Sequence, residues 1–225
     1  ALQDPTAAAQ ELERTVVEYG FKGAMINGHT LGRYYEGGEF DVFWERAQAL
    51  GVPIYLHPNA FSQAPALLEG MPVLQGAAWG WGVETAGHAL RLLFGGVFDR
   101  FPRLTLLLGH MGEALPYQRW RMDSRFAAYP SGIKLARKPS EYIGSNIVIT
   151  TSGVCSAPAL LGAIGELGAQ AVLFSVDYPY ESTAEACTFI EDAPLDDKTR
   201  AQVCHGNARR LFKLGSPEDL VLLQF

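Results

Sequence analysis

Short and almost uninterrupted runs of hydrophobic residues recur along the chain, and a polar turn follows each one. The five clearest runs are Phe21–Gly28, Val52–Pro58, Arg103–His110, Asn146–Gly153 and Ala171–Pro179. They do not alternate between hydrophobic and polar positions, as a strand with one face in water does. We therefore expect five strands that are buried on both faces, which is typical of parallel sheets.

Helical patterns lie between these runs. Phe40–Gly51 places its hydrophobic side chains on one helical face and ends at a glycine, which commonly terminates helices. Further helices are predicted before Phe21 and within Val83–Pro102, Ala157–Gly168 and Leu195–Phe212. Because strands and helices alternate, the fold class is α/β. No low-complexity segment or linker divides the chain, so we expect a single domain over residues 1–225, with a tail of unknown role at 215–225.

Composition excludes several classes of protein. The chain has 225 residues, of which 48% are hydrophobic and 19% charged, and this suits one globular core. The net charge of -6 and the lack of a basic run argue against nucleic-acid binding. No apolar run approaches the roughly 18 residues of a membrane span. The three widely spaced cysteines, Cys155, Cys187 and Cys204, indicate a reducing compartment, so we expect a cytoplasmic protein.

Polar residues that can carry chemistry follow the carboxyl end of each predicted strand. In a (β/α)8 barrel the active site is built at this rim. A doubly wound sheet also binds ligands at its carboxyl edge, but the glycine-rich phosphate loop usual in that fold is absent from the sequence. The residues concerned are Asn27, His57, His110 with Glu113, Thr150 to Ser152, and Asp177.

These residue types suit a metal site. Two neutral imidazoles and a carboxylate, from His57, His110 and Asp177, match the ligand preferences of Zn(II), Mn(II) or Fe(II). Glu113 lies three residues after His110 and would fix the tautomer of its ring. A single histidine after a strand is as compatible with a structural role, but three such residues at three strand ends favour a functional site. His88 lies within a helix among alanine and leucine, which indicates packing.

Several stretches together resemble the metal-dependent decarboxylases of the amidohydrolase superfamily, which include γ-resorcylate, 2,3-dihydroxybenzoate and aminocarboxymuconate-semialdehyde decarboxylases. The resemblance runs from residue 1 to about Leu214. The matching stretches are "PIYLHP", "ETAGHALRLLFGGVFDRFPRL", "LLLGHMGEALPYQRWRMD", "ITTSG", "LFSVDYPYE" and "GNARRLFKL".

The resemblance assigns roles to individual residues. His57 and Asp177 match metal-binding residues of the family, and His110, with Glu113 beside it, matches the catalytic histidine. Arg121 in "WRMD" matches an arginine associated with the carboxylate of the substrate, for which a guanidinium fork is suited.

Two further residues are expected to contact substrate. These are Asn27, at the end of the first predicted strand, and Tyr178, next to Asp177. Asp177 would also act as a general acid that protonates the ring carbon bearing the carboxylate.

The implied activity is the non-oxidative decarboxylation of a small hydroxylated aromatic, or muconate-like, carboxylic acid. The implied cofactor is one divalent metal ion, Zn or Mn, and the implied assembly is a homodimer or homotetramer. Two alternatives remain open: a metal-dependent hydrolase, such as a lactonase or esterase, of the same superfamily, and a non-catalytic barrel remnant acting as a binding scaffold.

The sequence departs from the family at one point. The first strand of the family carries two metal ligands, an acidic residue or histidine and then a histidine after one spacer, and no such strand occurs here. In the family plan the five predicted strands are the fourth to the eighth. We therefore expect an incomplete (β/α)8 TIM barrel that is truncated at its N-terminus.

Overall fold

The computed structural model describes residues 2–215. Five parallel strands form one sheet in the order β1-β2-β3-β4-β5, so consecutive strands are neighbours and the segments between them cross over the sheet. All five predicted strands are confirmed, although each is shorter than its hydrophobic run. The strands are β1 (Ala24–Asn27), β2 (Ile54–His57), β3 (Leu106–Leu108), β4 (Ile147–Thr150) and β5 (Val172–Leu173).

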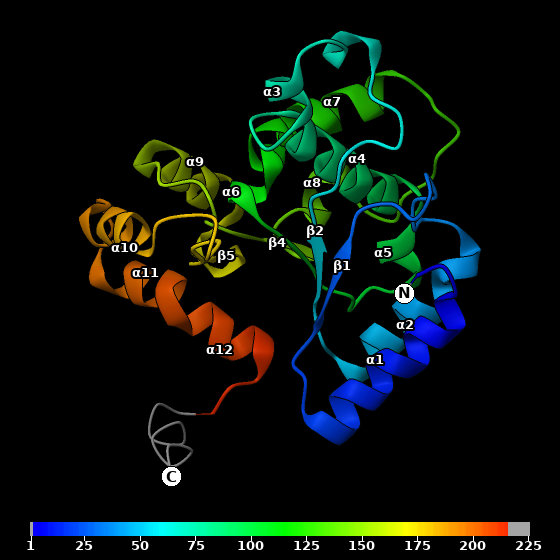
Figure 1. Cartoon of the computed structure of the whole chain (residues 1–225), viewed down its shortest axis with the longest axis horizontal. Helices are drawn as coiled ribbons and strands as arrows, with labels where there is room; N and C mark the ends of the chain where they lie inside the picture. The colour runs from blue at the N-terminus through cyan, green and yellow to red at the C-terminus, as the bar shows by residue number, and fades with distance from the viewer. Residues whose placement is uncertain (1, 216–225) are drawn as a thin grey trace.

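Helices surround this sheet (Figure 1). The α-helices are α1 (Pro5–Tyr19), α2 (Asp41–Leu50), α3 (Pro72–Gln75), α4 (Gly80–Phe94), α5 (Val97–Arg100), α6 (His110–Glu113), α7 (Arg119–Ala128), α8 (Pro139–Tyr142), α9 (Ala157–Leu167), α10 (Thr183–Asp192), α11 (Asp197–Ala201) and α12 (Asn207–Phe212). Shorter turns are η1 (Gly38–Phe40), η2 (Ala66–Leu68), η3 (Leu115–Gln118), η4 (Ala169–Ala171) and the π-helical η5 (Gln202–Gly206). In Figure 1, α1 and α2 lie beside β1 at one end of the sheet, and α9 to α12 lie toward β5 at the other.

Local sequence explains where the main helices begin and end. The side chain of Asp4 accepts hydrogen bonds from the first turn of α1, and Gly20 ends that helix with a left-handed backbone at φ 69°. Gly51 ends α2 in the same way, as its position in the sequence predicts. Ser156 caps α9, which carries a proline in its first turn.

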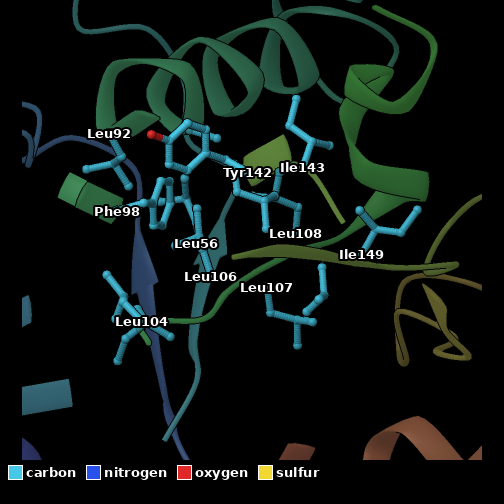
Figure 2. Packing of buried hydrophobic residues seen from close by; sticks show 14 of the residues in the cluster. Leu56, Leu92, Phe98, Leu104, Leu106, Leu107, Leu108, Tyr142, Ile143 and Ile149 are labelled. Carbon is cyan, nitrogen blue, oxygen red and sulfur yellow. The ribbon is translucent and has the colours of Figure 1, made fainter. Parts of the chain in front are cut away.

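The centre of the sheet is fully buried, whereas its first edge is not. Every residue of β3 and β4 is buried, and Figure 2 shows leucines of β3 packed with Phe98 and Tyr142. In β1, however, Met25 is 62% exposed and Asn27 is also exposed. The prediction that both faces of every strand are buried is therefore wrong for β1, because Met25 and Asn27 share one face of this strand and that face lies open among the described residues.

A buried amide fixes the short last strand. Asn207 is 1% exposed, and its Nδ2 donates to the carbonyls of Ala169 and Val172, both at 2.7 Å. These two hydrogen bonds connect α12 to η4 and to the first residue of β5, a strand of only two residues. Asp177 lies four residues beyond the end of this strand.

Candidate active site

The predicted site residues come from the carboxyl ends of parallel strands and therefore share one edge of the sheet. Asn27 and His57 are paired in register as the last residues of β1 and β2. His110 follows β3 after a single glycine, and Asp177 follows β5. The structure brings three of these residues, His110, Glu113 and Asp177, into direct contact.

The turn after β3 has an uncommon backbone. Five consecutive residues have left-handed φ angles: His110 (48°), Met111 (55°), Gly112 (75°), Glu113 (51°) and Ala114 (63°). This conformation costs about 1–2 kcal/mol for each residue other than glycine, so surrounding contacts must stabilise the turn. The short α6 is thus a strained left-handed turn rather than a regular helix. It allows a side chain at the end of a buried strand to turn onto the rim.

The imidazole of His110 lies between two carboxylates. Its Nδ1 is 2.7 Å from Oε1 of Glu113, and its Nε2 is 3.3 Å from Oδ2 of Asp177. Ionised carboxylates only accept hydrogen bonds, so both ring nitrogens are best used as donors. The hydrogen bond that His110 donates to Glu113 is the main cause that raises the pKa of His110, and Asp177 raises it further against the opposing effect of burial. The arrangement therefore favours the imidazolium form.

A glycine makes room for this contact. Gly153 follows β4 with φ 67°, and a Cβ atom there would lie 2.9 Å from Cδ2 of His110 and 3.6 Å from Oδ2 of Asp177. A larger residue would collide with the imidazole of His110, whereas its Cβ would make only an ordinary contact with Asp177. The sequence shows that the "TSG" part of "ITTSG" is polar, but no local pattern indicates that it contacts His110.

The hydrogen bonding of His57 leaves one of its ring nitrogens without a proton. Its Nδ1 lies 2.8 Å from the carbonyl oxygen of Pro58, and since a carbonyl only accepts, Nδ1 carries the proton. This leaves the lone pair on Nε2, which is the usual state of a histidine that binds a metal. Within residues 2–215 no group of three or more His, Cys, Asp or Glu side chains is arranged to hold a metal ion. The donor types of His57 and Asp177 fit a divalent ion, but they supply only part of its coordination shell.

The remaining predicted residues make no hydrogen bond to His110, Glu113 or Asp177 among those that the described residues form. Arg121, on α7, lines a largely apolar cavity of about 490 Å³ together with Leu90, Phe126 and Met122, and none of His57, His110, Glu113 or Asp177 lines that cavity. Tyr178 is 80% exposed, and the side chain of Asn27 is exposed at the edge strand. Binding of substrate by these three residues stays a prediction. His88, in contrast, is fully buried in α4, as its sequence context indicates.

Among residues 2–215, no helix has both the length and the apolar character that crossing a membrane requires.

Comparison with known proteins identifies the family. A family model described as Amidohydrolase matches residues 1–214. A γ-resorcylate decarboxylase from Polaromonas is 43% identical over 95% of this chain and 68% of its own length. The crystal structure of 5-carboxyvanillate decarboxylase from Sphingomonas paucimobilis has a TM-score of 0.91 and 42% identity, covering 96% of this chain and 65% of that one.

A second solved structure holds a metal. It is a dihydroxybenzoic acid decarboxylase from Polaromonas with bound manganese and the inhibitor 2-nitroresorcinol, with a TM-score of 0.89 and 42% identity over 100% of this chain and 69% of that one. The chain thus spans about two thirds of the length of these relatives. The resemblance read from the sequence motifs is confirmed, and so is the α/β fold: this chain belongs to the amidohydrolase family.

Proposed function

We propose that the protein catalyses the metal-dependent, non-oxidative decarboxylation of a small hydroxylated aromatic carboxylic acid. The observation that carries this proposal is the chain of contacts from Glu113 through His110 to Asp177 at the rim of the sheet. It supplies a proton donor beside a carboxylate that can also bind a metal. The γ-resorcylate and 5-carboxyvanillate decarboxylases, at 42–43% identity, support the same reaction class.

His57 and Asp177 are the proposed ligands of the metal, through Nε2 and a carboxylate oxygen. The ion is Mn or Zn, and manganese in the Polaromonas structure supports this choice. A bound divalent ion supplies Lewis-acid polarisation of the phenolic and carboxylate oxygens of the substrate. The Pro58 carbonyl keeps His57 in the tautomer that this role requires.

The side chains of Asp177, His110 and Glu113 then transfer one proton to the substrate. The imidazolium of His110, 3.3 Å from Asp177, passes the proton to this carboxylate, and Asp177 delivers it to the ring carbon that bears the carboxylate of the substrate, which interrupts aromaticity. The C–C bond breaks next, its electron pair returns to the ring, and CO2 leaves. His110 is then neutral and takes up a proton from water before the next turnover. Glu113 keeps the imidazole in its orientation and favours its protonated form.

The proposal also covers the assembly, location and partners of the protein. We propose that it is a cytoplasmic homodimer or homotetramer with a single barrel domain. Its ligand is a small aromatic acid, and it does not bind nucleic acid. Light scattering of the purified protein tests the assembly. A monomer at micromolar concentration would contradict that part of the proposal and leave the chemistry unaffected.

The activity is tested on protein expressed from its complete reading frame and loaded with Mn(II). We expect CO2 release from 2,6-dihydroxybenzoate or a related hydroxybenzoate. Replacing Asp177 by Asn should abolish it, since an amide cannot deliver the proton. Ring opening of a lactone without loss of carbon would instead identify a hydrolase.

A further inference from the structure

A serine in the turn that follows the neighbouring strand β4 anchors the strained turn at its first residue. The hydroxyl oxygen of Ser152 accepts a hydrogen bond from the backbone N–H of His110 at 3.1 Å. Ser152 is 2% exposed and His110 is half-buried, so this bond is partly shielded from water. A buried N–H without a partner costs about 1–3 kcal/mol, and this N–H belongs to the residue at which the left-handed run begins.

The Ser152 hydroxyl is itself held in place. Thr150, two residues earlier on β4, places Oγ1 3.0 Å from Oγ of Ser152 in a buried contact. From β2, the hydroxyl of Tyr55 approaches the same region: a Cβ atom on Gly109 would lie 2.4 Å from the Tyr55 oxygen and 2.9 Å from Oγ of Ser152. Gly109, the residue before His110, therefore lies close to two hydroxyl groups, one on β2 and one in the turn that follows β4.

The neighbouring threonine fixes the other catalytic segment. Oγ1 of Thr151 donates to the carbonyl of Ser175 at 2.9 Å and accepts from the N–H of Ser175 at 3.0 Å. Ser175 lies two residues before Asp177. The turn that ends β4 thus contacts the backbone leading to Asp177 with one residue and the backbone of His110 with the next.

We propose that Ser152 is a positioning residue for His110. Its hydroxyl holds the start of the left-handed turn, and this fixes the imidazole between Glu113 and Asp177. Ser152 does not touch the substrate and acts only through the geometry of His110. Its kinetic effect rests on the proposed decarboxylase function, whereas its effect on the imidazole does not.

The test replaces Ser152 by Ala, with Ser156→Ala as the matched control. Ser156 lies four residues away and caps α9 through its hydroxyl, so the control loses the same group at a comparable structural cost. We expect Ser152→Ala to lower kcat by about 10- to 100-fold, because a small displacement of a catalytic group has effects of this size. KM should change less than about twofold, since Ser152 makes no contact that binds substrate. Bound metal should be unchanged, and Ser156→Ala should keep the kcat of the unsubstituted protein.

A spectroscopic measurement separates this proposal from the proposed function. The Nδ1 proton of His110, hydrogen-bonded to Glu113, should give a downfield NMR resonance that shifts or broadens in Ser152→Ala and not in Ser156→Ala. If the protein releases no CO2 from any hydroxybenzoate but the resonance responds in this way, the proposed function is wrong and the positioning role stands. An unchanged kcat together with an unchanged resonance in Ser152→Ala overturns the positioning role.

A measurement on the unsubstituted protein covers the case in which Ser152→Ala does not fold. The amide of His110 is bonded to Oγ of Ser152, so we expect it to exchange slowly with deuterium. Exchange as fast as that of a solvent-exposed loop amide would overturn the proposal.

Discussion

Glu113 accepts a hydrogen bond from Nδ1 of His110 at 2.7 Å across a turn in which both residues have left-handed backbones. The side chain of Glu113 is only 7% exposed, so its charge acts on the imidazole with little screening by water. The strained backbone at these two positions therefore directs the buried carboxylate of Glu113 toward Nδ1 of His110. The other ring nitrogen, Nε2, is left facing Asp177.

Replacing Glu113 by Gln should lower kcat by about 10- to 100-fold, the range found when the partner of a functional histidine is removed. The amide keeps the shape of the side chain but loses the charge that favours imidazolium. Steady-state kinetics with metal-loaded protein measure the effect. The control is Glu166→Gln, which removes an exposed carboxylate that pairs with Arg119 on the surface. Equal kcat values for the two variants would contradict the role of Glu113.

Much of this arrangement could be predicted from the sequence. The hydrophobic runs identify all five strands, because burial at the centre of a parallel sheet demands continuous apolar residues. The parallel order then implies that His57, His110 and Asp177 end at one edge. The pairing of His110 with Glu113 followed from their spacing.

Other features depend on tertiary contacts that no local pattern records. The left-handed run at His110–Ala114 forms because Ser152 and neighbouring strands support it, and the individual residues do not favour it. The hydroxyl of Tyr55 reaches Gly109 from another strand. The place of Arg121 in a separate cavity depends on how α7 packs, and "WRMD" alone does not specify this.

Replacing His57 by Ala should lower the affinity for Mn(II) by more than about 100-fold. Loss of an outer partner of a metal ligand already costs 10- to 100-fold, and loss of the ligand itself costs more. Elemental analysis after dialysis measures the metal-to-protein ratio. His205→Ala is the control, because His205 is exposed and belongs to no strand end. A normal ratio in His57→Ala would rule out this residue as a ligand.

Replacing Arg121 by Lys should lower kcat/KM for a carboxylated aromatic by about tenfold or more, since lysine keeps the charge but lacks the bidentate fork. Metal content should not change. Arg125→Lys is a matched control, because Arg125 lines the same cavity but is not part of the predicted substrate motif. Kinetics equal to those of the unsubstituted protein in Arg121→Lys would show that the guanidinium does not bind the substrate carboxylate.

Stability should depend on pH through His88. Burial lowers the pKa of this histidine to about 3, from 6.5 in a solvated chain, and its Nε2 accepts the N–H of Tyr35 at 3.3 Å. Between pH 6.5 and about 3, His88 therefore binds a proton in the unfolded chain but not in the folded chain. The contribution of His88 to stability is fully present above pH 6.5 and is lost as the pH falls toward 3.

We expect the free energy of unfolding to fall by about 1.5 kcal/mol between pH 6.5 and about pH 5 through this group alone. Urea titrations at several pH values measure the slope. Replacing His88 by Gln should reduce the slope, whereas His205→Gln, at an exposed position, should keep it. Equal slopes in the two variants would show that His88 is not buried in its neutral form.

The last prediction concerns the glycine at the centre of the strained turn. Gly112 has φ 75°, and a Cβ atom there would lie 2.6 Å from Cγ2 of Ile149 on β4 and 3.2 Å from Cδ of Pro116. Alanine would therefore add both backbone strain and a collision with a buried branched side chain. We expect Gly112→Ala to lower the free energy of unfolding by about 2–4 kcal/mol.

Gly87 is the matched control for Gly112. It lies on the exposed side of α4, and no atom lies within 4 Å of an added Cβ, so Gly87→Ala should stabilise the protein by about 0.5–1 kcal/mol. Thermal unfolding of both variants gives the sign of each change. If Gly112→Ala unfolds at the same temperature as the unsubstituted protein, the turn after β3 does not pack against Ile149 as described, and the support for the orientation of His110 would have to come from elsewhere.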